Sequence, residues 1–181
     1  RSFEVGRGRN NLKLFLNYLS FTVSATLKAF FFKEKFDVVL VNQLSPIMMA
    51  IPAIVYKKKF KKKIMLYCLD LWPASLAAGG IKESSFIYRM FLNLSRWIYN
   101  SVDLIAVTSS MFKEYFANTL SIKGKEILHL PQYAEELFTT TVEVEKNGKY
   151  NFVFAGNIGD MQSVETIVKA ANELRKRTDI I

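Results

Sequence analysis

Short apolar runs alternate along this chain with longer segments of helical periodicity, and this alternation constrains the fold more than any other feature. Runs of this kind, without regular polar residues between the apolar ones, are typical of buried strands in a parallel sheet whose crossovers are helices. The sequence therefore predicts an open, doubly wound parallel α/β sheet. The predicted strands are Asp37–Asn42, Ile64–Leu69, Asp103–Val107, Ile127–Leu130 and Asn151–Ala155.

The most apolar segment is Leu12–Phe32, interrupted by Lys13, Asn17 and Lys28. Its length is just sufficient to span a bilayer. The two lysines and the scattered polar residues favour instead a long helix that is buried or lies at a membrane interface.

Four further helices are predicted from local signals. Ser45–Pro46 predicts an N-cap with proline in the first turn of a helix that runs toward Tyr56 and is disturbed at Pro52. Apolar residues at helical spacing between Phe86 and Ile98 predict an amphipathic helix. Ser109 and Ser110 are placed to cap a helix that begins near Met111, and a last helix is predicted from Val164 to Leu174.

Composition limits the chemistry. The chain has 181 residues, half of them hydrophobic, a net charge of +9 and a single cysteine, Cys68. One cysteine and one histidine support neither a disulfide framework nor a Cys/His metal site, so we expect no metal and no bound cofactor. Cys68 is predicted to be a small core residue, and His129, inside a predicted strand, a core histidine.

The chain begins at Arg1 and ends on an apolar pair of isoleucines, so we expect a fragment truncated at both ends. A change of composition predicts a domain of residues 1–140, a linker of residues 141–149 and the start of a second domain in residues 150–181.

Six lysines surround Phe60 and carry much of the positive charge. Such a cluster attracts the phosphates of anionic lipids or of nucleic acid, although it can also be an ordinary solvated helix end. No nucleic-acid motif or stacking platform accompanies it, so a membrane-facing patch is the preferred functional interpretation. The six residues are Lys57, Lys58, Lys59, Lys61, Lys62 and Lys63.

Polar residues follow every predicted strand, at the edge of the sheet where ligands bind in open α/β folds. Asp70 could exchange a proton with a substrate hydroxyl or cap the next helix, and both interpretations stay open. Trp72 could be a sugar platform but is more typical of a packing residue. The candidate residues at this edge are Asn42, Ser45, Asp70, Trp72, Ser109 and Gln132.

The turn Gly156-Asn157-Ile158-Gly159 follows the last predicted strand and precedes a helix. Glycines there let the backbone approach a ligand, and the free N–H groups of the helix favour a phosphate. An ordinary tight turn is the alternative, because the third glycine of the dinucleotide-binding fingerprint is absent.

Three motifs carry a resemblance to a known family. Asp70-Leu71-Trp72-Pro73-Ala74-Ser75, Leu130-Pro131-Gln132-Tyr133-Ala134-Glu135, and Phe154-Ala155-Gly156-Asn157-Ile158-Gly159 followed by Gln162 resemble family 4 glycosyltransferases of the GT-B fold. The branch that builds bacterial O-antigen and capsule is the most similar, and Asn17–Phe21 also resembles it.

The resemblance implies two Rossmann-like domains with a cleft between them. Residues 1–140 would be part of the N-terminal, acceptor-side domain, and residues 150–181 the first βα unit of the donor-binding domain. The implied substrates are a nucleotide-sugar, expected to be a UDP-sugar, and a polyprenyl-diphosphate-linked glycan. Transfer would retain the anomeric configuration, need no metal, and occur at the cytoplasmic face of the plasma membrane, where the protein is peripheral.

The resemblance also implies roles for the candidate residues. Asp70 would be the catalytic carboxylate, and the acceptor-side cleft would include Asn42, Ser45, Trp72, Ser109 and Gln132. The donor diphosphate would lie on Gly156, Asn157, Gly159 and Gln162.

The chain departs from the family pattern at both ends and at one internal residue. The family's opening strand and its glycine-rich loop would precede Arg1. The downstream Arg/Lys pair and Glu-x7-Glu motif that grip the donor would follow Ile181, and Ser163 replaces a common glycine. We therefore expect the isolated chain to be inactive. Two other functions stay open: another GT-B enzyme such as a nucleotide-sugar epimerase, and a non-catalytic membrane-associated scaffold.

Overall fold

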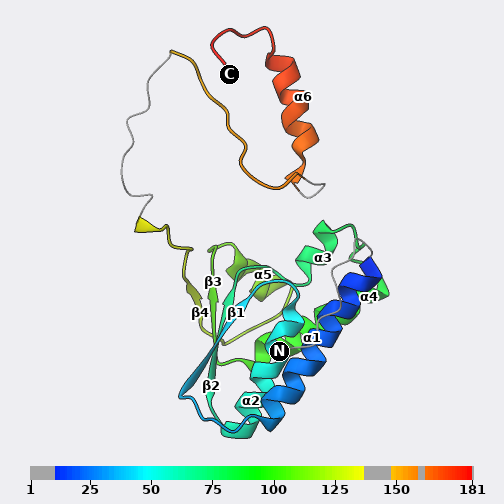
Figure 1. Ribbon diagram of the computed structural model, residues 1–181, viewed down its shortest axis with the longest axis vertical. Coiled ribbons are helices and arrows are strands. Elements are labelled where there is room, and N and C mark those ends of the chain that lie inside the picture. Colours follow the sequence, from blue (N-terminus) through cyan, green and yellow to red (C-terminus); the bar gives the residue numbers. More distant parts are fainter. Residues whose placement is uncertain (1–10, 137–147, 159–161, 181) are drawn as a thin grey trace. The chain divides into compact units, whose positions relative to one another are not determined.

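A computed structural model of the chain describes residues 11–136, 148–158 and 162–180 (Figure 1). The chain divides into two units, residues 1–132 and residues 133–181.

Unit 1 is built on a four-stranded parallel sheet with the order β1-β2-β3-β4. Each strand lies within one residue of its predicted bounds, so the α/β fold class with a parallel sheet is confirmed. The strands are β1 (Val38–Gln43), β2 (Lys63–Cys68), β3 (Leu104–Val107) and β4 (Ile127–His129).

Helices connect the successive strands (Figure 1). A 3₁₀ turn precedes α2, and Pro52 lies in the first turn of α2, which agrees with the predicted disturbance. The helical elements of unit 1 are α1 (Asn11–Phe31), η1 (Ile47–Ala50), α2 (Ile51–Phe60), α3 (Ala74–Ala78), α4 (Phe86–Ser101) and α5 (Phe112–Asn118).

The core lies on one face of the sheet. The register aligns Val41 with Leu66 and Leu66 with Ile105, and these residues are buried together. Strands added one after another in one direction by right-handed crossovers place all of their crossover helices on the same face. The opposite face is therefore open on β1, where Val38 and Leu40 are 61% and 64% exposed. The expectation that this strand is fully buried was wrong.

The long N-terminal helix was predicted to be either buried or interfacial, and it is less buried than the first prediction requires. Helix α1 packs on α2 and η1 through one side, where Thr22 is buried and Tyr18 contacts the core. Most of its remaining apolar side chains are exposed. A fully buried α1 is thus excluded in this structure, whereas the interfacial form is compatible with it.

Unit 2 contains α6 (Val164–Leu174), as the sequence predicts. Residues 151–155 form no strand, so that prediction was wrong for this structure. Among the described residues of unit 2, strand-like pairing is limited to one parallel bridge between Tyr150 and Ile180. A strand needs a neighbour to accept and donate its hydrogen bonds, and Phe152 and Val153 remain exposed without one.

Candidate functional site

The carboxyl ends of the four strands gather polar turns at one edge of the sheet, which we call the carboxyl edge. Ser45 follows β1, Asp70 follows β2, Ser109 follows β3 and Gln132 follows β4. Because the strands are parallel, their carboxyl ends lie on the same edge. Unit 1 therefore brings these predicted residues to one side of the molecule.

Gln43, at the end of β1, joins two of these turns. Its side chain is fully buried, and its Nε2 donates hydrogen bonds to Leu44 O (2.6 Å) and Asp70 O (2.9 Å). Its Oε1 accepts a hydrogen bond from the Tyr99 hydroxyl of α4 (3.1 Å). All the polar atoms of the amide thus have partners, and the backbone of the turn after β2 is fixed to β1 and α4.

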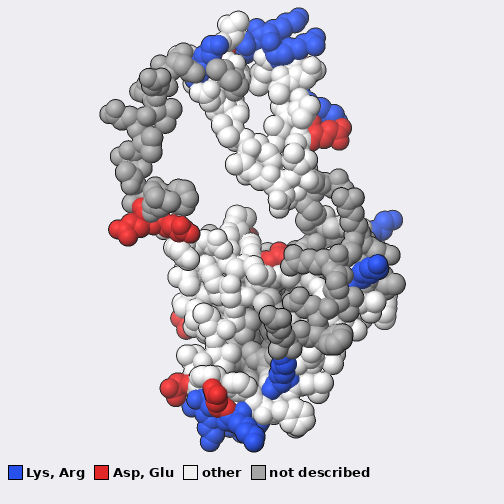
Figure 2. Space-filling view, in the orientation of Figure 1, with Lys and Arg blue, Asp and Glu red and all other residues white. Residues whose placement is uncertain are grey.

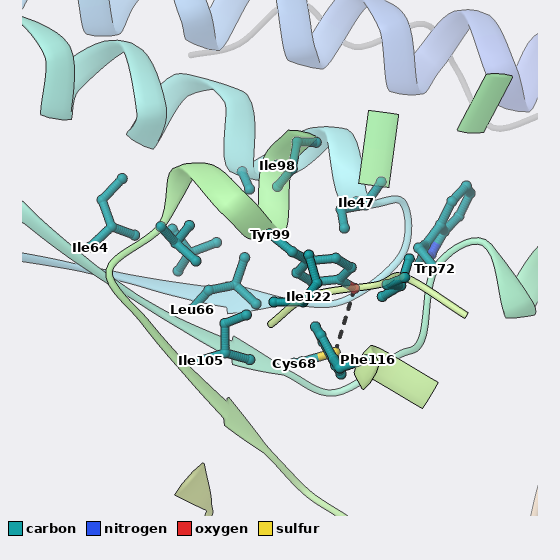
Figure 3. Close-up of a cluster of buried hydrophobic side chains, with 14 of the residues drawn as sticks. Ile47, Ile64, Leu66, Cys68, Trp72, Ile98, Tyr99, Ile105, Phe116 and Ile122 are labelled. Atoms are coloured by element: carbon teal, nitrogen blue, oxygen red, sulfur yellow. Dashed lines mark hydrogen bonds between the residues drawn. The ribbon is translucent and has the colours of Figure 1, made fainter. Parts of the chain in front are cut away.

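Cys68 lies under the same turn. Its Sγ is 3.4 Å from Asp70 O and 3.6 Å from the Tyr99 hydroxyl, toward which it points in Figure 3. Burial raises the pKa of the Cys68 thiol to about 12, although the hydrogen bond between the thiol and the Tyr99 hydroxyl lowers this pKa. The thiol is therefore a protonated core group, and the prediction of a core cysteine is confirmed.

Trp72 is a packing residue in this structure. The indole is 5% exposed, and its ring lies edge-on to Phe91 with centroids 5.4 Å apart. Its Nε1 donates to Ser45 Oγ at 3.0 Å, which ties the turn after β1 to the turn after β2. The buried indole therefore offers no open face for a sugar to stack on.

Ser45 has a different role from the predicted one. It is not a helix N-cap, because Pro46 occupies the N-cap position of η1 and no side chain caps it. The hydroxyl of Ser45 is instead the acceptor for the Trp72 indole. The peptide bonds Ser45–Pro46 and Trp72–Pro73 are both cis.

Asp70 presents a half-buried carboxylate at this edge. Its Oδ1 accepts a hydrogen bond from Ser75 Oγ, in α3, at 2.5 Å. Among the described residues no hydrogen bond reaches Oδ2. The backbone of Asp70 is held by Gln43 and Cys68, so a fixed carboxylate retains one oxygen for an outside hydroxyl or N–H group.

The other predicted residues of unit 1 lie apart from this cluster of bonds. Asn42 is exposed and lines a groove between α1 and β1. Ser109 Oγ accepts the N–H of Met111 at 3.3 Å. Met111 is the N-cap of α5 and no side chain caps the helix, so the prediction that the two serines cap it was wrong. Gln132 is exposed at the end of the unit. His129 is exposed too, so the prediction of a core histidine was wrong.

In unit 2, Gly156, Asn157 and Gln162 are exposed, and Gly159 lies outside the described residues. Ser163 precedes α6 with a φ of 49°, in the left-handed region that favours glycine. Ser163 thus has a backbone conformation that glycine adopts more easily, at the position where the family resemblance predicts a glycine.

The six lysines divide into two groups. The Nζ of Lys57 binds Asp103 at 2.7 Å and donates to Ser101 O at 2.8 Å. Lys63 binds the same carboxylate at 3.1 Å. Lys57 is therefore engaged within the fold, and Lys63 shares its partner, while the membrane-facing role of the six lysines stays a prediction.

Asp103 joins these two lysines to the start of β2, since it also accepts the N–H of Ile64 at 2.8 Å. Partial burial raises the pKa of the Asp103 carboxyl, but the bonds from Lys57, Ile64 and Lys63 outweigh this effect and lower the pKa to about 2. A carboxyl with a lowered pKa in the folded state stabilises the fold above its unfolded pKa and loses that stabilisation as the pH falls.

We expect unit 1 to lose about 1 kcal/mol of unfolding free energy as the pH falls from about 4 to about 2, because Asp103 is partly solvent-screened. Urea denaturation over a pH series measures this loss. Asp103→Asn should remove this part of the acid dependence. The same acid-induced loss in that variant as in the wild type would show that Asp103 is not its source.

No cluster of three or more His, Cys, Asp or Glu side chains suited to a metal ion occurs in residues 11–136, 148–158 and 162–180. Within that part of the chain, the groups at the carboxyl edge that could take part in a reaction are hydrogen-bonding groups and one carboxylate.

Comparison with known proteins gives one informative similarity. No protein-family model matches the chain. A Pseudomonas aeruginosa protein described as "Probable glycosyltransferase WbjE" is 29% identical over 164 residues, which cover 83% of this chain. The chain spans 38% of the length of that relative. Over most of its length, this parallel α/β chain is therefore similar to a bacterial protein described as a glycosyltransferase.

Proposed function

We propose that the protein containing this chain is a glycosyltransferase that moves a sugar from a nucleotide-sugar to a glycan acceptor. The similarity to the Pseudomonas protein over 83% of the chain carries this proposal. The parallel sheet with polar turns at its carboxyl edge supports it, since sugar and nucleotide ligands bind at that edge in open α/β folds.

In the proposed reaction Asp70 acts on the acceptor. Its carboxylate accepts the proton of the attacking hydroxyl, whose oxygen bonds to the anomeric carbon of the donor. The bond from that carbon to the diphosphate breaks, and the nucleoside diphosphate leaves. Ser75 holds the carboxylate through Oδ1, and Gln43 holds its backbone.

Trp72 and Ser45 serve this site indirectly. Their mutual hydrogen bond and the burial of the indole fix the turn that carries Asp70. We assign them a positioning role in place of direct sugar contact. Asn42, Ser109 and Gln132 remain proposed acceptor-side residues.

The donor diphosphate is proposed to lie on the glycine turn of unit 2, with Gly156, Asn157, Gly159 and Gln162 around it. Backbone amides and the N-terminus of a helix stabilise a leaving diphosphate without a metal ion. Retention of the anomeric configuration requires the acceptor hydroxyl to attack from the same face of the sugar that the diphosphate leaves. A UDP-sugar donor and a polyprenyl-diphosphate-linked acceptor of surface polysaccharide synthesis complete the proposal. Such an acceptor requires a peripheral position at the cytoplasmic membrane face.

Nucleotide release from a panel of UDP-, GDP- and dTDP-sugars tests the proposal. The chain is expressed together with its flanking coding sequence, and the 181-residue chain alone is expected to give background release. Release from one donor that increases when a polyprenyl-diphosphate-linked glycan is added supports the transferase. Conversion of the donor sugar to its epimer without acceptor would assign the epimerase instead, and absence of any turnover would favour the scaffold.

A further inference from the structure

One end of unit 1 exposes a group of phenylalanines, which we call the aromatic end: Phe30, Phe31, Phe32 and Phe36. The rings contact one another, with Phe30 edge-on to Phe31 at 5.3 Å and Phe32 stacked on Phe36 at 5.9 Å. Phe31 is nevertheless 71% exposed. Exposed apolar clusters of this kind mark interaction surfaces in soluble domains.

The aromatic end continues into a stripe along α1. Five residues at spacings of three and four share one side of the helix and are each 40–59% exposed. The opposite side, with Thr22, is the one that packs on the domain. These five residues form the outer stripe: Leu16, Leu19, Val23, Leu27 and Phe30.

Lysines border this apolar surface. Lys59 Nζ donates to Phe30 O and Phe32 O, both at 2.5 Å, and lies 4.9 Å from the centroid of the Phe60 ring. Figure 2 shows the basic side chains gathered at this end of unit 1, with acidic ones beside them. Lys57 and Lys63 are set aside because both bind the Asp103 carboxylate. The lysine rim then consists of Lys58, Lys59, Lys61 and Lys62, and Lys62 Nζ lies 3.4 Å from the exposed carboxylate of Asp37.

The combination of an apolar helix side with a basic border fits an anionic lipid bilayer. Helices of this kind lie in the interfacial plane, with the apolar side among the acyl chains and the cations on lipid phosphates. Lys13–Phe31 is long and apolar enough to cross a membrane by length and composition. However, one side of α1 packs on α2, so the helix lies on the domain as a surface element.

The surface leaves the Asp70 carboxylate free. The lysine rim lies at the end of α2, before β2 begins, whereas Asp70 follows β2. A strand of six residues separates them by about 20 Å. Helix α1 runs beside α2 and ends at the rim (Figure 1). A domain lying on its outer stripe thus keeps the carboxyl edge open to a lipid-linked substrate.

We propose that the outer stripe and the aromatic end of unit 1 insert into the interfacial region of an anionic phospholipid bilayer, with the lysine rim on the phosphates. This inference rests on the proposed function in one respect, which is that the enzyme lies peripherally at a membrane. Binding to lipid can be measured without donor or acceptor, so its failure is distinguishable from failure of sugar transfer.

The test is co-sedimentation of the 181-residue chain with vesicles of phosphatidylcholine alone or mixed with phosphatidylglycerol. The apolar variant is Leu27→Ser/Phe30→Ser/Phe31→Ser. Its matched control is Phe86→Ser/Ile87→Ser/Met90→Ser, which replaces three exposed apolar residues on a different helix, α4. Circular dichroism verifies that each variant retains the wild-type fold.

We expect wild type to prefer the anionic vesicles and to dissociate as salt rises. The apolar variant should bind at least about 10-fold more weakly, while its control binds like wild type. The lysine variant Lys58→Gln/Lys61→Gln/Lys62→Gln should likewise bind anionic vesicles at least about 10-fold more weakly than wild type. Its control, Lys82→Gln/Lys113→Gln/Lys123→Gln, should bind them like wild type.

Equal binding of wild type and the folded apolar variant would overturn the proposal. So would equal binding of wild type to neutral and anionic vesicles. A third contrary result is absence of vesicle binding together with a dimer that the apolar variant dissociates, since this would assign the stripe to a second copy of the chain.

Discussion

Asp70→Asn is expected to lower kcat for sugar transfer by at least about 100-fold in the active protein, because general-base catalysis by a positioned carboxylate contributes effects of this size. Asparagine retains an oxygen that can accept the Ser75 hydroxyl, so the turn should keep its geometry. The unfolding free energy should stay within about 0.5 kcal/mol of wild type. Steady-state kinetics with the cognate donor, and urea denaturation, measure the two quantities.

Asp37→Asn is the control for this variant. Asp37 is a fully exposed carboxylate before β1, at the opposite edge of the sheet, and its removal should leave kcat unchanged. If Asp70→Asn retained wild-type kcat, Asp70 would be a structural partner of Ser75 and the proton acceptor would lie elsewhere.

Gln43→Leu is expected to destabilise unit 1 by about 2–4 kcal/mol. The leucine would leave the Tyr99 hydroxyl without the Gln43 acceptor and Leu44 O without the Gln43 donor. Asp70 O would keep only the weak donor Cys68 Sγ. Each buried polar group that loses its partner costs about 1–3 kcal/mol. Urea denaturation measures the change.

Asn42→Leu makes the same kind of replacement at the preceding residue, which is exposed, and should change stability by less than about 0.5 kcal/mol. A similarly small change for Gln43→Leu would mean that the buried amide does not hold the two turns together. In that event the position of Asp70 would depend on its contacts with Cys68 and Ser75 and on the Trp72–Ser45 bond.

The positions of the strands could be predicted because each one is an uninterrupted apolar run between polar residues. The predicted bounds of β1 and β2 differ from the observed ones by a single residue at each end. Yet in a strand one residue decides the face to which a side chain belongs. Asn42 was therefore chosen as the site residue, whereas Gln43, its neighbour, faces the core and binds the Asp70 turn.

The details of the site depend on partners far apart in the chain. Trp72 binds Ser45 across 27 residues, and Lys57 binds Asp103 across 46 positions of sequence. Composition and periodicity give no information about such pairs, so the indole was assigned to a cleft and the lysine to a membrane. Asp70, by contrast, could be located from sequence, since a polar residue directly after a buried strand must lie at the carboxyl edge.

The exposure of apolar residues that were predicted to be buried has a related explanation. An apolar run predicts that a strand can be buried but not which neighbours bury it. Val38 and Leu40 of β1 are exposed because the crossover helices pack on the other face of the sheet. Residues 151–155 are apolar enough for a strand, yet they form none without a pairing partner.

Transfer of a sugar to a lipid-linked glycan, with Asp70 as the acceptor-side carboxylate, can be tested most directly by mass spectrometry of the lipid product. The product is formed by the chain with its flanking coding sequence. We expect a product heavier than the acceptor by one sugar residue, formed by wild type and Asp37→Asn and reduced at least about 100-fold by Asp70→Asn. An acceptor whose mass is unchanged with every donor that the protein turns over would contradict this expectation.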